Sequence, residues 1–355
     1  MRAGTLLGGA VAFLLSAPAF GFPGPSLGTE KIPQLMTDST LACKGEVIEA
    51  PDVTFSDNPE LPRLTATALV RVDRCFKGQP PDGGVVSVLF DDVLPAGGMG
   101  GGTPLVVLQK GDYRLYFLKP QGEEYVLVDG WFGQLTISRN LAGDSSDAPD
   151  PMQRLEADLK AGLSDPDRDR VLDSIRMLGN MRRLQSEAEL IALLDSPDSL
   201  VRTSVWEAML RLHDYSVLPG VEQWLMQQPP APTSFVLPGN SLIQMQYRLA
   251  AQISDIRDPA YLPTMERLLR LPNLAMRRGI FQGIRSIDSR QSAPTFLTLL
   301  DDPDDDIGFI AMQSLFELAG GGPIDWVPSV EQFHANRAYY ANLCREWWQS
   351  KTLQP

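Results

Sequence analysis

Residues 301–318 read DDPDDDIGFIAMQSLFEL, and residues 195–212 read DSPDSLVRTSVWEAMLRL. In both stretches an acidic turn with a proline precedes apolar residues that recur every three or four positions, which is the spacing of one face of an α-helix. An aspartate at the end of such a turn is a preferred helix N-cap. The two stretches therefore predict helices that begin in the same way at two distant points of the chain, as in a repeat protein.

Five helices of this kind align by their last apolar residue. These helix ends are Leu178, Leu212, Ile256, Ile287 and Leu318. The residue three positions before each end is also apolar, and these residues are Ile175, Met209, Ile253, Ile284 and Leu315. The residue four positions before the end is small in four helices, at Ser174, Ala208, Gly283 and Ser314. A small residue at that place predicts that two helices approach each other closely.

A second helix is expected after each of three helix ends. A proline stands seven residues after the end, at Pro219, Pro263 and Pro294. The first helical turn tolerates proline because its N–H groups have no partner within the helix. A proline-rich insertion at 228–238 accounts for the one long spacing between repeats.

Over residues 165–326 this pattern of acidic turns and apolar stripes resembles HEAT-like repeats. Such helical hairpins also occur in phycocyanobilin lyase-type proteins and armadillo relatives. The resemblance implies an α-α solenoid that binds partners. We expect a lead-in helix and repeats over 152–326. Residues 327–355 are expected to form a C-terminal capping helix.

The N-terminal half has the pattern of a β domain. Residues 37–140 contain six short apolar-rich segments separated by glycine and proline, which predicts a small β-barrel or sandwich. The expected strands are 41–48, 64–76, 85–90, 113–118, 125–128 and 134–137. Residues 141–151 are polar and rich in helix breakers, so we expect a linker there. The predicted fold class is therefore multidomain α+β, with a β domain before a helical solenoid.

The strands carry three motifs, LACKGEV at 41–47, ALVRVDRCFKG at 68–78 and GDYRLYFL at 111–118. They resemble the netrin-like barrels, which are related to tissue inhibitors of metalloproteinases and share the OB-like architecture. Animal members of that family inhibit metalloproteases through a cysteine at the mature N-terminus. Residues 19–28 contain no cysteine. Inhibition or regulation of an extracellular protease through the β domain is an alternative function.

Residues 1–19 have the features of a signal peptide. Arg2 precedes an apolar run at 6–15, and Ala17-Pro-Ala19 places small residues where a signal peptidase acts. We expect cleavage, an irregular leader at 20–36, export to the periplasm or the exterior, and no membrane insertion afterwards. An oxidising compartment favours a disulfide between Cys43 and Cys75, with two buried free thiols as the alternative.

Composition excludes several classes of function. The chain has 31 basic and 44 acidic side chains and a net charge of −13, so it is poorly suited to bind nucleic acid. Two histidines and three cysteines exclude His-rich zinc sites and multi-cysteine clusters. The sequence contains no catalytic motif that we recognise, so we expect no enzyme, no catalytic residue and no cofactor.

The acidic run at 301–306 allows two interpretations. An EF-hand loop counted from Asp302 would need Gly and Glu where Ile307 and Gln313 stand, so that pattern fails. The position of the run before a helix favours capping. A metal-dependent module or enzyme centred on Asp301–Asp306 is the alternative.

Residues 248–290 are rich in basic side chains and contain eight arginines but only four acidic residues. Arg267 and Arg270 lie between the apolar columns of a second helix and are expected to point outward. Together with Arg277 they form a candidate site for an anionic partner, whereas the simpler interpretation is a solvated face with local salt bridges. The sequence as a whole predicts an exported, non-enzymatic scaffold that binds another protein.

Overall fold

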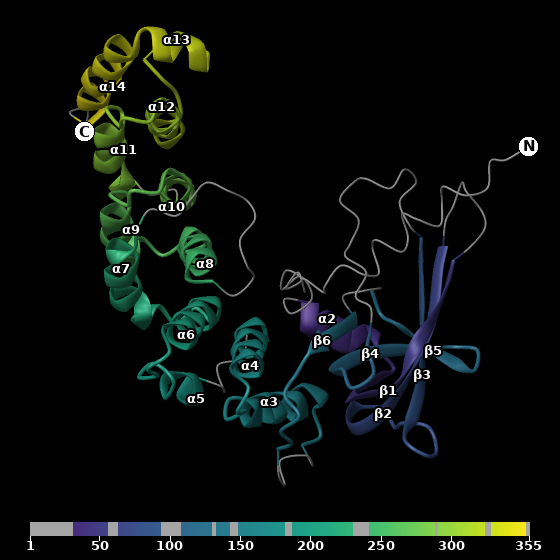
Figure 1. The fold of residues 1–355 in the computed structure, drawn as a ribbon. Coiled ribbons are helices and arrows are strands. Elements are labelled where there is room, and N and C mark those ends of the chain that lie inside the picture. The colour runs from purple at the N-terminus through teal and green to yellow at the C-terminus, as the bar shows by residue number, and fades with distance from the viewer. Residues whose placement is uncertain are drawn as a thin grey trace, which may run out of the picture. The chain divides into compact units, whose positions relative to one another are not determined.

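The protein has an N-terminal β-barrel followed by a series of helices, as the predicted α+β fold class requires (Figure 1). The computed structural model describes residues 31–55, 63–93, 108–129, 133–142, 148–181, 187–229, 241–287, 290–323 and 328–352. The described residues separate into two compact units. The first ends at Leu212 and also includes residues 241–242, and the second contains residues 213–229 and those from Ile243 onward. The predicted signal peptide at 1–19, most of the leader and most of the insertion at 228–238 lie outside the described residues.

The barrel contains all six predicted strands. They are β1 (Leu41–Phe55), β2 (Arg63–Lys77), β3 (Val85–Val93), β4 (Tyr113–Gln121), β5 (Glu124–Leu127) and β6 (Gln134–Thr136). The strand order is β1-β2-β3-β5-β4, and pairing of β1 with β4 closes the ring. Strand β6 adds to β4. The closed ring shows that the β domain is a barrel and not a sandwich.

The disulfide expected between Cys43 and Cys75 is present. The two cysteines are direct partners in the β1–β2 register. Cys43 is buried in the barrel core with Val47 and Val70. Because strand side chains alternate between faces, the neighbouring Lys44 points away from this core. The disulfide thus joins the two longest strands on the inner face of the barrel.

A short helix, α2 (Ile32–Asp38), occupies part of the expected irregular leader and the first residues of the expected β region. Pro33 lies in its first turn, and Ile32, Leu35 and Met36 are buried. Their spacing puts them on one face of the helix. This apolar face packs near β4 and α3, so tertiary contacts stabilise a segment too short to be recognised as a helix from periodicity.

Four helices complete the first unit. They are α3 (Pro151–Gly162), α4 (Arg168–Asn180), α5 (Glu187–Ile191) and α6 (Ser199–Arg211). Asp150 caps α3 and Pro151 is its first residue. Helix α3 packs against strand β2. The polar stretch at 141–151 therefore leads directly into a helix that belongs to the same compact unit as the barrel.

The second unit contains longer and shorter helices in alternation. The longer ones are α8 (Leu242–Ser254), α10 (Leu274–Ser286) and α12 (Asp305–Ala319). The shorter ones are α7 (Leu218–Gln227), α9 (Leu262–Leu268) and α11 (Ala293–Leu299). Each shorter helix has its predicted proline in the first turn. Within this unit α7, α9 and α11 form one layer and α8, α10 and α12 the other (Figure 1).

The predicted columns have the expected roles in packing. The residues three positions before the helix ends are all buried. A Cβ atom added to Gly283 on α10 would lie 2.7 Å from the Cα atom of Ser254 on α8. One added to Gly179 on α4 would lie 2.7 Å from the Cα atom of Ala208 on α6. The small residues Ala208 and Gly283 therefore lie where neighbouring helices approach most closely.

The C-terminal region forms two helices where one capping helix was expected. Helix α13 (Val330–Ala335) begins with a capping box at Ser329, and α14 (Arg337–Thr352) follows after Asn336. The backbone of Asn336 is not helical, with φ −134° and ψ 34°, and this interrupts the helix. Phe333 is buried beside the aromatic ring of Tyr340. No helix in the described part of the chain has the length and apolarity needed to cross a membrane.

Candidate functional site

The five aspartates between the end of α11 and the first turn of α12 form one local structure, which we call the acidic turn. Its members are Asp301, Asp302, Asp304, Asp305 and Asp306. Asp304 is the N-cap of α12, and its carboxylate accepts a hydrogen bond of 3.0 Å from the amide of Ile307. Asp305 and Asp306 lie in the first helical turn, where negative charge is favourable. The capping role predicted for the acidic run is confirmed.

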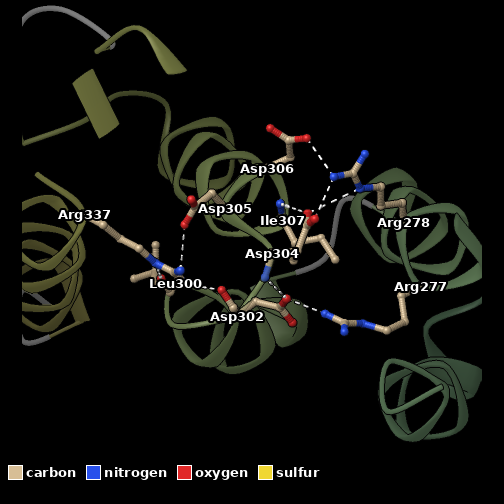
Figure 2. Close-up of polar contacts among 9 residues, drawn as sticks. All are labelled: Arg277, Arg278, Leu300, Asp302, Asp304, Asp305, Asp306, Ile307 and Arg337. Carbon is tan, nitrogen blue, oxygen red and sulfur yellow. Dashed lines mark hydrogen bonds and ion pairs between the residues drawn. The ribbon is translucent and has the colours of Figure 1, made fainter. Parts of the chain in front are cut away.

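Arginines from α10 reach the acidic turn from one side (Figure 2). Arg278 lies 2.7 Å from a carboxylate oxygen of Asp304 and 2.7 Å from one of Asp306. Arg277 forms an ion pair with Asp302. These contacts connect α10 to the helix that follows it in the same layer.

Arginines from α14 reach the acidic turn from the other side. Arg337 lies 3.0 Å from Asp305 and also donates to the main-chain carbonyl oxygens of Leu300 and Asp302 (Figure 2). Arg345 forms an ion pair with Asp301. Every carboxylate of the acidic turn therefore has an arginine partner, and the turn joins the C-terminal helix to the hairpin before it.

The electrostatics of Asp304 reflect these contacts. Partial burial by itself would raise the pKa of its carboxyl group. Hydrogen bonds from Arg278 and from the amide of Ile307, together with the charges of Arg278 and Arg277, outweigh burial and lower the pKa below its ordinary value. Asp304 is therefore ionised at neutral pH. Among the residues that the structure describes, no group of three or more His, Cys, Asp and Glu side chains could hold a metal ion.

The three arginines proposed from the sequence do not form one site. Arg267 on α9 pairs with Glu222 on α7, at 2.5 Å. Arg277 is only 15% exposed and pairs within the acidic turn. Arg270 is exposed and has no ion-pair partner in the described ranges. Two of the three arginines thus hold neighbouring helices together, and Arg270 alone faces solvent without a carboxylate.

Polar contacts also connect the shorter helices in sequence. Glu222 on α7 pairs with Arg267 on α9. Glu266 on α9 accepts a hydrogen bond from Thr295 on α11. The pair Asp301–Arg345 continues from the end of α11 to α14. We call these three contacts the polar ladder. The hydrogen bond from Arg267 holds the pKa of the Glu222 carboxyl group below its ordinary value.

The sequence did not reveal the polar ladder. Glu222 and Arg267 are 45 residues apart, and their pairing depends on how two helices lie side by side. A signal was available, because Glu222 lies ten residues after one helix end and Arg267 lies eleven after the next. Both positions fall between buried columns, so both side chains point away from the core.

A second polar cluster joins the barrel to α3. Lys44 on β1 and Asp158 on α3 both have fully buried side chains, and their charged atoms are 2.8 Å apart. Arg74 on β2 also pairs with Asp158. Lys44 donates in addition to the carbonyl oxygens of Asn140 and Ser138. We call Lys44, Arg74 and Asp158 the junction cluster.

Burial is the main cause that lowers the pKa of Lys44, and its hydrogen bond and ion pair with Asp158 oppose the shift. An ion pair without solvent contact is maintained only when its remaining hydrogen-bonding groups are satisfied, and the carbonyl oxygens do this for Lys44. The junction cluster was missed because a lysine within a strand is usually exposed. Its contacts hold α3 against the barrel.

The chain matches no protein-family model, and no curated protein is significantly similar to it. The arrangement of its own residues is therefore what indicates its function.

Proposed function

We propose that this protein is an exported, non-enzymatic scaffold that binds another protein. In this proposal the helices of the second unit form a HEAT-like array, and the outward faces of α7, α9 and α11 contact the partner. The polar ladder is the observation that carries the proposal. It connects each of these helices laterally to the next, so that their outward faces lie side by side.

The burial pattern of the shorter helices supports a two-sided layer. Their inward residues Val221, Met265 and Phe296 are almost completely buried. At the position eleven residues after each helix end, Gln223, Arg267 and Thr298 are exposed. Side chains that are already ordered on a rigid layer lose less conformational entropy when a partner binds. A ladder of polar contacts can thus favour recognition without any catalytic group.

Two features support an exported location as part of the proposal. The Cys43–Cys75 disulfide is of the kind that persists in oxidising compartments. The expected signal peptide at 1–19 would direct the chain there. The barrel, held to α3 by the junction cluster, would provide a second contact surface.

Affinity capture with matched variants tests the binding function. The chain from residue 20 onward is immobilised and exposed to an envelope extract of the organism that produces it. The outer-face variant carries Gln223→Glu and Thr298→Glu. The control carries Gln282→Glu, which changes an exposed residue of α10 in the other layer.

We expect the wild-type chain and the control to retain the same protein in amounts near equimolar to the bait. The outer-face variant should retain at most about one tenth as much, because a charge placed in the middle of an interface costs several kcal/mol when it lacks a partner. Equal retention by all three chains would contradict the proposal. If the retained protein were a protease that the chain inhibits, the inhibitor alternative would replace it.

A further inference from the structure

Three aromatic rings gather in the turns that precede α7 and α9, and we call them the ring cluster. Tyr215 and Tyr261 meet edge to face, with ring centroids 4.9 Å apart and planes at 65°. His213 meets Tyr215 at 6.0 Å and 82°, and its Nδ1 atom lies 2.9 Å from the Tyr215 hydroxyl oxygen. Tyr215 and Tyr261 lie in the 3-10 turns η5 (Tyr215–Val217) and η6 (Pro259–Tyr261).

The ring cluster is accessible to solvent. His213 is exposed, and Tyr215 and Tyr261 are only partly buried. In an edge-to-face pair, the ring that contributes its edge keeps both of its faces uncovered by the other ring. These faces carry the negative part of the aromatic quadrupole and attract cations.

Carboxylates surround the ring cluster. Asp214 and Asp258 cap the two 3-10 turns, and the side chain of Asp255 is 74% exposed. Among the described residues one cation, Arg257, lies close to them. Its guanidinium is 4.0 Å from the Asp255 carboxylate and donates to the main-chain carbonyl oxygens of Ser254 and Ile256. Three carboxylates and one arginine leave an excess of negative charge around the rings.

The carboxylates are close enough to affect the rings directly. Burial is the main cause that raises the pKa of Tyr215, and the neighbouring Tyr261, Asp258 and Asp255 raise it further, while Arg257 opposes them. The negative charges of Asp255 and Asp258 disfavour the tyrosinate form of Tyr215, and the same charges favour a cation beside its ring. The rings and the carboxylates therefore attract the same kind of group.

We propose that the ring cluster, with Asp255 and Asp258, binds a lysine or arginine side chain of the partner protein. The proposal rests on the scaffold function and specifies the partner as one with a basic segment. The local excess of carboxylates over arginine at the rings favours the approach of such a partner. The aromatic faces provide short-range attraction, and the two carboxylates provide the charge complement.

A fluorine NMR titration tests this inference on the full chain labelled with 3-fluorotyrosine. The probe is the peptide acetyl-Gly-Lys-Gly-Lys-Gly-amide, and the matched peptide has glutamate in place of lysine. We expect the lysine peptide to shift the Tyr215 and Tyr261 resonances saturably. Tyr339 on α14 is 60% exposed and serves as the internal control that should not shift.

Variants separate ring attraction from a general charge effect. Tyr215→Leu is expected to weaken binding of the lysine peptide about fivefold, whereas Tyr215→Phe, which keeps the ring, stays within about twofold. Asp255→Asn together with Asp258→Asn should also weaken binding, and asparagine retains the capping ability of Asp258. Equal shifts at Tyr339, equal binding of the glutamate peptide, or unchanged binding by Tyr215→Leu would overturn the inference.

Its failure can be distinguished from failure of the scaffold function. If capture still depends on Gln223 and Thr298 but the lysine peptide does not shift Tyr215, this inference is wrong and the scaffold function stands. If the lysine peptide binds as expected and no protein depends on those outer faces for capture, the cation site stands and the scaffold function is wrong.

Discussion

At the scale of single residues, Lys44 and Asp304 show two opposite uses of charge. Lys44 is fully buried and lies against Asp158 and two carbonyl oxygens, so its charge orders the contact between a strand and a helix. Asp304 lies at a helix N-terminus and combines capping with an ion pair. Removing one partner of the buried pair leaves a charge without solvent, and this costs far more than breaking an exposed pair.

Asp158→Asn should lower the free energy of unfolding by about 3 kcal/mol or more, because Lys44 and Arg74 lose their shared carboxylate. Urea denaturation followed by circular dichroism measures the change. Asp129→Asn is the matched control, since it breaks the exposed Lys31–Asp129 pair. We expect that control to change stability by less than about 1 kcal/mol. Equal losses in the two variants would show that the junction cluster is not a critical contact.

Asp304→Ala should destabilise the chain by about 1–2 kcal/mol at pH 7, and Asp304→Asn should cost less because asparagine also caps helices. The pKa of Asp304 is lower in the folded state than its ordinary value of 3.8. The ion-pair contribution is therefore complete above that value and is lost as the pH falls through the folded pKa. Urea denaturation at pH 7 and pH 3 checks this, and a pH-independent gap between wild type and Asp304→Asn would contradict it.

Local patterns determined which single residues could be predicted. The cap at Asp304 was recognisable because it depends on near neighbours in sequence. The cysteine pair was recognisable because an oxidising compartment favours a disulfide. The partner of each arginine was not recognisable. Lys44 and Asp158 are far apart in the sequence, and only the docking of α3 on the barrel brings them together.

At the scale of elements, glycines on α10 distinguish close packing from open surface. A Cβ atom at Gly283 would lie 2.7 Å from Ser254 and 2.8 Å from Met265, whereas one at Gly279 on the same helix would meet nothing within 4 Å. The same substitution at the two positions should therefore act in opposite directions. This contrast tests the close approach of α8, α9 and α10.

Gly283→Ala should destabilise the chain by about 1–3 kcal/mol because the added methyl group overpacks the contact. Gly279→Ala should stabilise it by about 0.5–1 kcal/mol, because alanine loses less conformational freedom than glycine in a helix. Thermal denaturation of both variants provides the comparison. A stabilising Gly283→Ala would mean that α10 does not approach α8 as described.

Elements with long or regular patterns were predictable, and short or interrupted ones were not. The six strands and the helices α4, α6, α8, α10 and α12 followed from alternation, apolar spacing and proline positions. Helix α2 was missed because seven residues give too few turns to show a period. The interruption at Asn336 between α13 and α14 was missed because no glycine or proline stands there to mark it.

At the scale of the whole molecule, the boundary between the two compact units lies at Leu212 and His213. The barrel shares its unit with α3, α4, α5 and α6. Arg170 on α4 donates to the main-chain oxygen atoms of Tyr113 and Ile137, and so adds to the contacts of the junction cluster. The composition shift at 141–151 marks the change from strands to helices. The barrel and α3 on its two sides belong to the same compact unit.

A fragment that ends at Leu212 should fold, and one that ends at Ala148 should not. The shorter fragment exposes the surface that α3 covers and leaves Lys44 without Asp158. The two fragments are compared by the dispersion of their amide resonances in NMR spectra, with the disulfide intact in both. A well-dispersed spectrum from the shorter fragment would show that the barrel is independent of α3.

The central claim is that the outward faces of the shorter helices bind a partner. Site-specific photo-crosslinking in the producing cells tests it most directly, with the crosslinker placed at 223, at 298 and, as the control, at 282. The account predicts one adduct of the same mass from positions 223 and 298 and none from position 282. Adducts absent from 223 and 298, or equally abundant at 282, would contradict it.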